Sequence, residues 1–177
     1  MKHLYTAAAT SLLLSTSLLA ADDLSGAHDF DFEHGSWNVH HRLKRPTGEW
    51  YEMDGTSRTW PTLGGRGNVE DNLFHRPTGD TRGEAVRAYD PATATWAIWW
   101  IDSRFPHNPL DPPMIGKFVN GIGTFYADGP INGKPARTRF LWTHAEDTAR
   151  WEQAFSFDGG KTWDTNWIME FKRAKSE

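Results

Sequence analysis

ARWEQAFSFDGGKTWDTNWIMEF, residues 149–171, consists of two runs of alternating side chains around the turn sequence Asp158-Gly159-Gly160-Lys161. Successive side chains of a β-strand point to opposite faces of a sheet, so this alternation is typical of strands with one buried face. In the turn, Asp158 can accept hydrogen bonds from nearby backbone N–H groups, and the two glycines can adopt positive φ angles. The stretch therefore predicts a β-hairpin.

The same period-two pattern recurs along the chain, between short connections rich in Gly, Pro, Asp and Asn. No long helical spacing follows the first 21 residues, so the sequence predicts an all-β fold, an up-and-down antiparallel barrel of about ten strands. Residues 28–35 predict a brief helical turn, and the long connection 103–113 predicts a lid or mouth loop. The predicted strands are 36–44, 49–60, 68–75, 83–90, 95–102, 114–119, 122–128, 137–144, 149–157 and 163–171.

The segment SFDGGKTW, residues 156–163, also fits the Asp box that decorates β-propellers, including sialidases. A propeller repeats its blade, because one four-stranded blade cannot bury its own face. The chain holds one copy of the segment and no internal repeat. The pattern therefore favours a hairpin turn over a propeller blade.

Gly35-Ser36-Trp37 resembles the Gly-x-Trp that begins the first strand of lipocalins and other calycins. More narrowly, HDFDFEHGSWNVHHR, TLGGRGN, AYDPATATWAIWWID and WEQAFSFDGGKTWDTNWIMEFKR resemble an exported bacterial lipocalin-like family of unknown function. The resemblance spans most of residues 28–173. It implies that Trp37 closes the barrel floor and that Arg173 covers its indole. It implies no activity, since one fold serves many functions.

Residues 1–21 have the features of a secretory signal peptide, with a basic residue at Lys2, an apolar run and small residues at the end. The run is interrupted by serines and is shorter than the roughly 20 apolar residues that span a bilayer. We therefore expect cleavage after Ala20 or Ala21, a single domain over residues 22–177, a periplasmic or secreted location and no membrane attachment after cleavage.

The composition narrows the classes of partner. Removal of residues 1–21 leaves 18 basic and 23 acidic residues, and no basic cluster, which argues against nucleic-acid binding. The chain has no cysteine, which excludes disulfides and thiolate metal sites. Ten Trp and ten Phe residues can line a cavity as well as fill a core. The sequence leaves open a homodimer.

Strand alternation indicates which side chains face the lumen. With Trp37 inward, His41 also points inward and His40 points outward. Closure of the last hairpin at 158–161 pairs Gln153 with Asn166, a register that a bulge would slip by one. Arg58, Arg87 and Arg139 are arginines that could meet a buried acid or a ligand. The predicted ligand-binding residues are His41, Arg58, Tyr89, Trp100, Trp142, Trp151, Gln153, Asn166 and Trp167.

Three functions follow from this pattern. The favoured one is an exported barrel that binds a small, largely apolar or aromatic molecule in its lumen, without a cofactor. The alternative is an enzyme that uses the cavity for acid–base hydrolysis, hydration or lyase chemistry, with candidates His41, His144, Glu152 and Glu170. A haem or metal barrel is less favoured, because adjacent strand histidines such as His40 and His41 cannot converge on one ion. No metal ligand is therefore predicted.

Overall fold

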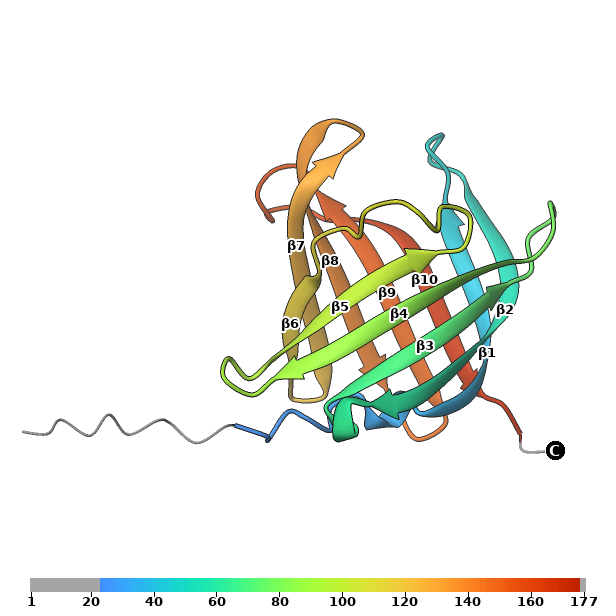
Figure 1. Ribbon diagram of the computed structural model, residues 1–177. Coiled ribbons are helices and arrows are strands. Elements are labelled where there is room, and N and C mark those ends of the chain that lie inside the picture. The colour runs from blue at the N-terminus through green and yellow to red at the C-terminus, as the bar shows by residue number, and fades with distance from the viewer. Residues whose placement is uncertain (1–22, 176–177) are drawn as a thin grey trace, which may run out of the picture.

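The computed structural model describes residues 23–175 and has ten antiparallel strands in a closed barrel (Figure 1). The predicted signal peptide lies outside the described residues. The predicted fold class is confirmed. The elements are η1 (Asp31–Glu33), β1 (Gly35–Lys44), β2 (Trp50–Thr62), η2 (Leu63–Gly65), β3 (Gly67–Phe74), β4 (Thr81–Asp90), β5 (Thr95–Asp102), β6 (Met114–Val119), β7 (Ile122–Ile131), β8 (Lys134–His144), β9 (Thr148–Ser156) and β10 (Asp164–Arg173).

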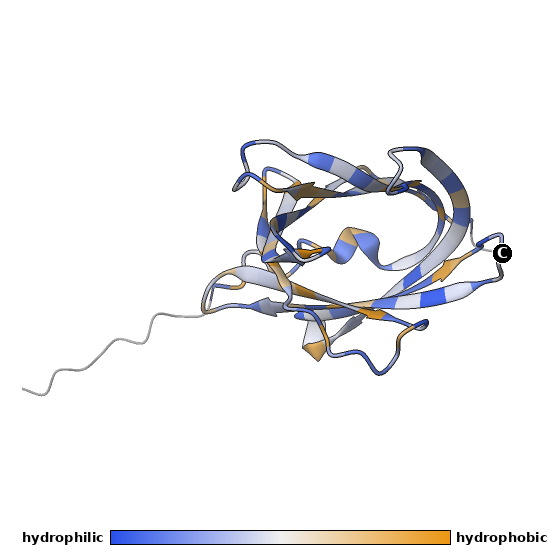
Figure 2. Ribbon diagram, turned by 90° about the horizontal axis from the view of Figure 1, so that it is seen from above, coloured by the Kyte–Doolittle hydropathy of each residue, from blue (hydrophilic) through white to orange (hydrophobic). Residues whose placement is uncertain are grey.

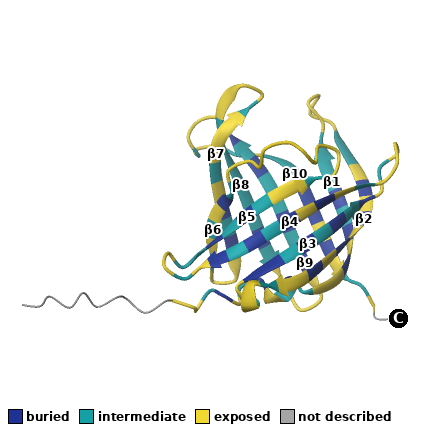
Figure 3. Cartoon of the chain, in the orientation of Figure 1, coloured by how far each residue is buried: buried dark blue, intermediate teal, exposed yellow. Residues whose placement is uncertain are grey.

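Each strand pairs with its neighbour in sequence, and β1 closes the barrel against β10. Buried and exposed residues alternate along the strands (Figure 3). On β1, Trp37, Val39 and His41 are buried, whereas His40 lies on the outer wall beside Asp54. The alternation predicted from the sequence therefore holds for this strand, and it places His41 inside the barrel.

The β7–β8 hairpin is longer than the sequence predicted. The strands continue into residues 129–136, which lie between the two predicted strands, as far as Asn132 and Gly133. These residues have φ angles of 50° and 76°, the left-handed backbone that a two-residue hairpin turn requires. The extended hairpin projects beyond the other strands at the end of the barrel opposite η1 (Figure 1).

The last hairpin is slipped by one residue from the predicted register. Gln153 pairs with Trp167 and Glu152 with Ile168, because a β-bulge lies between Thr165 and Trp167. The turn itself forms as expected, since Asp158 Oδ1 accepts hydrogen bonds from the backbone N–H groups of Lys161 and Thr162. A slip of one residue exchanges the inner and outer faces of a strand. On β10 it places Trp167, Met169 and Phe171 inside.

The short helix η1 closes one end of the barrel, and it lies inside the ring of strands when the barrel is viewed from above (Figure 2). Phe30 beside it packs against Trp96, Phe118 and Phe125. Trp37 donates an indole hydrogen bond of 2.7 Å to the carbonyl of Glu33. Sequence analysis had predicted both the helical turn and a floor built on Trp37.

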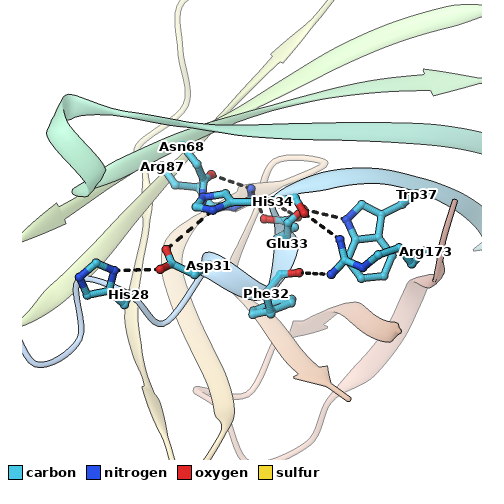
Figure 4. A network of polar contacts seen from close by, with 9 residues as sticks. All are labelled: His28, Asp31, Phe32, Glu33, His34, Trp37, Asn68, Arg87 and Arg173. Atoms are coloured by element: carbon cyan, nitrogen blue, oxygen red, sulfur yellow. Dashed lines mark hydrogen bonds and ion pairs between the residues drawn. The ribbon is translucent and has the colours of Figure 1, made fainter. Parts of the chain in front are cut away.

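Arg173 seals the floor from the last strand. Its guanidinium lies 3.9 Å from the centre of the Trp37 ring and donates to the carbonyls of Phe32 and His34, each at 2.7 Å (Figure 4). A guanidinium over an indole face is a favourable cation–π contact. The predicted cover of Trp37 by Arg173 is therefore present. No helix within residues 23–175 is long and apolar enough to cross a membrane.

Candidate functional site

The barrel encloses a cavity of about 460 Å³ above its floor. Its lining includes Asp111 and Pro112 of the 103–113 loop and residues 128–131 of the β7–β8 hairpin. The expected mouth loop therefore borders the cavity. Most of the lining is apolar and comes from β5 to β10, with the large side chains Ile98, Trp100, Met114, Phe140, Trp142, Trp151, Phe155, Trp167 and Met169.

The lumen has two unlike walls. The aromatic residues face a polar wall on β3 and β4, where Glu70, Asn72 and Arg87 line the same cavity. A cavity with one apolar side and a few fixed polar groups can hold a small molecule in one orientation. The asymmetry is thus suited to a flat molecule with one polar edge.

A buried ion cluster lies at the base of the polar wall. The Arg87 guanidinium pairs with Glu33 of η1 at 2.6 Å and donates to Asn68 at 3.0 Å (Figure 4). It also pairs with Glu70 of β3. Ser57 donates to the other oxygen of Glu70 at 2.8 Å. All of these side chains are buried. The cluster therefore joins the floor helix to the barrel wall.

Two acids share this one guanidinium. Burial raises the pKa of the Glu33 carboxyl well above its usual range, against the opposing attraction of Arg87. Burial by itself would lower the pKa of Arg87, but Glu33 and Glu70 together raise it. Arg87 therefore keeps its positive charge, and burial favours the protonated form of Glu33.

His41 is buried behind the aromatic wall. Its Nδ1 accepts a long hydrogen bond of 3.4 Å from the indole of Trp167, and its ring lies 5.0 Å from that of Phe74. Burial lowers the pKa of His41 from 6.5 to about 4, more strongly than Glu70 raises it. His41 is therefore a neutral hydrogen-bond acceptor that supports Trp167.

We expect the stability of the protein to fall in acid because of His41. The pKa of this imidazole is about 4 in the folded chain and 6.5 when unfolded, so the unfolded chain takes up its proton first as the pH falls. The contribution is complete above pH 6.5 and is lost between there and about pH 4, by roughly 3 kcal/mol. Urea unfolding at several pH values measures this slope.

His41→Gln should flatten that slope, whereas His40→Gln, on the outer wall, should leave it unchanged. Equal slopes in the wild-type protein and His41→Gln would show that His41 is not held neutral by burial.

The structure brings five of the predicted ligand-binding residues to the cavity: Trp100, Trp142, Trp151, Gln153 and Trp167. Asn166 lies next to them, because the Gln153 side-chain amide donates to its Oδ1 at 2.8 Å. The bulge at Asn166 preserves this contact although the backbone register differs from the predicted one.

Two predicted ligand-binding residues lie elsewhere. Arg58 is exposed on the outer wall, since Ser57 and Thr59 are the inward residues of β2. Tyr89 points inward but lies at the closed end, where its hydroxyl donates to the carbonyl of Asp23 at 2.9 Å. Arg87, the second arginine considered, points inward and meets buried acids, whereas Arg139 stacks on Trp163 on the outer side.

The four predicted catalytic residues do not meet in the cavity. Glu152 and Glu170 lie on the outer wall, where both pair with Arg150. The bulge reverses the face expected for Glu170 on β10, whereas Glu152 alternates with Trp151 and Gln153, the inward residues of β9. His144 is exposed at the floor, where its ring stacks on Phe32 at 4.0 Å. With His41 behind Trp167, the arrangement does not form an acid–base site.

Glu33, Glu70 and Asn72 are site residues that the sequence pattern did not predict. In the segment NVEDNLFH, residues 68–75, both faces carry polar residues, so alternation could not show which one lines the lumen. The sequence did contain one signal. Asn68, Glu70, Asn72 and Phe74 are two residues apart and therefore share a face of the strand, and the apolar Phe74 favours that face as the inward one. Within residues 23–175, no group of three His, Asp or Glu side chains is arranged to hold a metal ion.

Comparison with known structures identifies the fold. The chain is similar to the S-type phycobiliprotein lyase CPES from Guillardia theta, with 12% identity over 84% of this chain and 92% of that chain and a TM-score of 0.57. It is also similar to Rv2717c from M. tuberculosis, with 10% identity over 86% of this chain and 100% of that chain and a TM-score of 0.58.

Both neighbours are lipocalin-like barrels, as the resemblance in the sequence implied. No family model and no curated protein matches the chain. At these identities the likeness concerns the fold alone.

Proposed function

We propose that this protein binds a small, largely apolar or aromatic molecule in the lumen of its barrel. The observation that carries the proposal is the cavity of about 460 Å³, in which one wall is aromatic and the other presents Glu70, Asn72 and Arg87. The volume lies within the usual range for small-molecule sites. The aromatic wall supplies contact area, and the polar wall fixes orientation.

We also propose that the mature protein, residues 22–177, acts as one domain in the periplasm or outside the cell. The support is the composition of residues 1–21, which has the basic start, apolar run and small residues of a signal peptide. A barrel in that location can carry or sequester its ligand.

Binding accounts for the geometry better than catalysis does. One structural neighbour is named a lyase, which keeps enzymatic use of such a barrel as the alternative. A general acid or base needs a group that can reach the reacting proton. Glu70 is the carboxyl group in the deep wall, and both its oxygens are engaged, by Arg87 and by Ser57.

A titration with N-phenylnaphthylamine, an apolar dye that brightens in apolar surroundings, tests this function. We expect saturable binding to one site, with quenching of tryptophan fluorescence and a higher melting temperature. Ala127→Phe should weaken binding about tenfold or more, because the new ring fills lumen space.

The matched control is Ala97→Phe on β5, between the inward residues Trp96 and Ile98 and therefore on the outer face. It should leave the affinity unchanged. Equal affinity in the wild-type protein and Ala127→Phe, or dye binding that does not saturate, would place the dye outside the lumen and contradict the proposal.

A further inference from the structure

Asn72 on the polar wall has a side-chain amide without a partner. It lines the cavity and is 1% exposed, and within residues 23–175 neither its Oδ1 nor its Nδ2 makes a hydrogen bond. A buried polar group left without a hydrogen bond destabilises the fold. In the wall of a cavity, such a group can be satisfied by hydrogen bonds to a ligand.

The charged groups of the same wall are engaged with one another, apart from the Nε of Arg87, which makes no hydrogen bond within residues 23–175. Glu70 holds Arg87 and Ser57, and Arg87 holds Glu33 and Glu70. A carboxylate ligand would meet Glu70, and a cationic ligand would meet Arg87. The paired charges of Glu70 and Arg87 therefore oppose a charged ligand of either sign, and Asn72 supplies the uncharged hydrogen-bonding groups of the wall.

Asn72 contributes a free acceptor and a free donor side by side. Asn72 offers one carbonyl oxygen and one amide nitrogen in a plane, which pair with a group that presents N–H and C=O on adjacent atoms. Trp142 adds another donor, because its buried Nε1 also makes no hydrogen bond within the described chain. Carbonyl oxygens of a ligand would satisfy both donors.

We propose that the lumen selects an uncharged, planar aromatic compound with a lactam edge, an N–H next to a C=O in one ring, which Asn72 binds through two hydrogen bonds. This inference rests on the proposed function, since it names the class of ligand for the same cavity. The lactam ring lies against the polar wall, and the remaining rings face Trp151 and Trp167.

The position of Trp100 explains how a ligand reaches Asn72. Gly83 is the cross-strand partner of Asn72, and the Trp100 ring lies so close over Gly83 that a Cβ there would fall 2.2 Å from it. Trp100 is at the rim and 39% exposed, so its ring has room to move. The Asn72 amide is shielded from water, so the proposed ligand reaches it only if a neighbouring side chain such as Trp100 shifts or the Asn72 side chain rotates.

Carbostyril, a bicyclic aromatic lactam, tests the inference against three probes of similar shape. N-methylcarbostyril lacks the N–H, naphthalene lacks the polar edge, and naphthoate carries a negative charge. Isothermal titration of the wild-type protein should give carbostyril an affinity about 10- to 100-fold higher than that of N-methylcarbostyril or naphthoate. This comparison needs no variant.

Asn72→Leu should remove the preference, so that carbostyril binds no better than naphthalene. The melting temperature of the Asn72→Leu protein should equal or exceed that of the wild-type protein. Asn38→Leu, at an exposed position on β1, is the control and should keep the preference. Equal affinities of carbostyril and N-methylcarbostyril, or a preference that survives in Asn72→Leu, would overturn the inference.

The two proposals fail in different ways. If naphthalene binds in the lumen but carbostyril has no advantage, the lactam inference is wrong and the binding function stands. If none of the four probes binds, the proposed function itself fails.

Discussion

Arg87→Met is expected to lower the free energy of unfolding by about 3–5 kcal/mol, the usual effect of removing one partner from a buried ion cluster. The substitution leaves Glu33 and Glu70 facing each other in the closed half of the barrel without a cation. It also removes the guanidinium that lies 4.9 Å from the Phe30 ring and 5.5 Å from the Trp142 ring. Urea unfolding followed by tryptophan fluorescence measures the loss.

The barrel supplies a matched control on its outer wall. Arg150 also bridges two glutamates, Glu152 at 2.9 Å and Glu170 at 2.8 Å, but its side chain is 37% exposed. Exposed ion pairs contribute about 1 kcal/mol or less, so Arg150→Met should have a small effect. If the two substitutions cost the same, the inner cluster does not hold the floor to the barrel.

Trp37→Ala is expected to destabilise the protein by about 3–5 kcal/mol, the range for emptying a large buried aromatic site. The indole is 1% exposed, lies under Arg173 and donates to Glu33. Its loss opens a cavity in the floor and removes the hydrogen bond that positions the residue paired with Arg87. Thermal and urea unfolding both report the change.

Trp60→Ala provides the comparison for Trp37, because Trp60 lies on the outer wall and is 41% exposed. The free energy of unfolding of the Trp60→Ala variant should stay close to that of the wild-type protein. A Trp37→Ala variant as stable as Trp60→Ala would mean that Trp37 does not close the barrel.

The fold was predictable because it depends on local signals. Alternation defined the strands, turn residues separated them, and Gly35-Ser36-Trp37 with Arg173 indicated where the barrel closes. The β7–β8 hairpin was predicted too short, because Pro130 and Pro135 suggested a connection, whereas Asn132-Gly133 forms the turn. Proline lacks the backbone N–H of a ladder and therefore obscures a strand.

The site was only partly predictable, because it depends on register and on contacts distant in sequence. Glu170 faces outward because of the bulge before Trp167, and the residue type at position 166 does not predict a bulge. The pairing of Glu33 with Arg87 joins residues 54 positions apart. Asn72 was not predicted as a site residue because both faces of its strand carry polar residues. Only the closed barrel shows which face is inside.

The claim that the lumen is the binding site is tested most directly by NMR of the tryptophan indole N–H groups. Trp→Phe variants assign the signals, and N-phenylnaphthylamine is then titrated in. We predict that shifts concentrate on Trp100, Trp142, Trp151 and Trp167, which line the cavity, while Trp60 and Trp163 on the outside stay unchanged. Shifts at Trp60 and Trp163 alone, or no shift of any indole at saturating dye, would contradict the account.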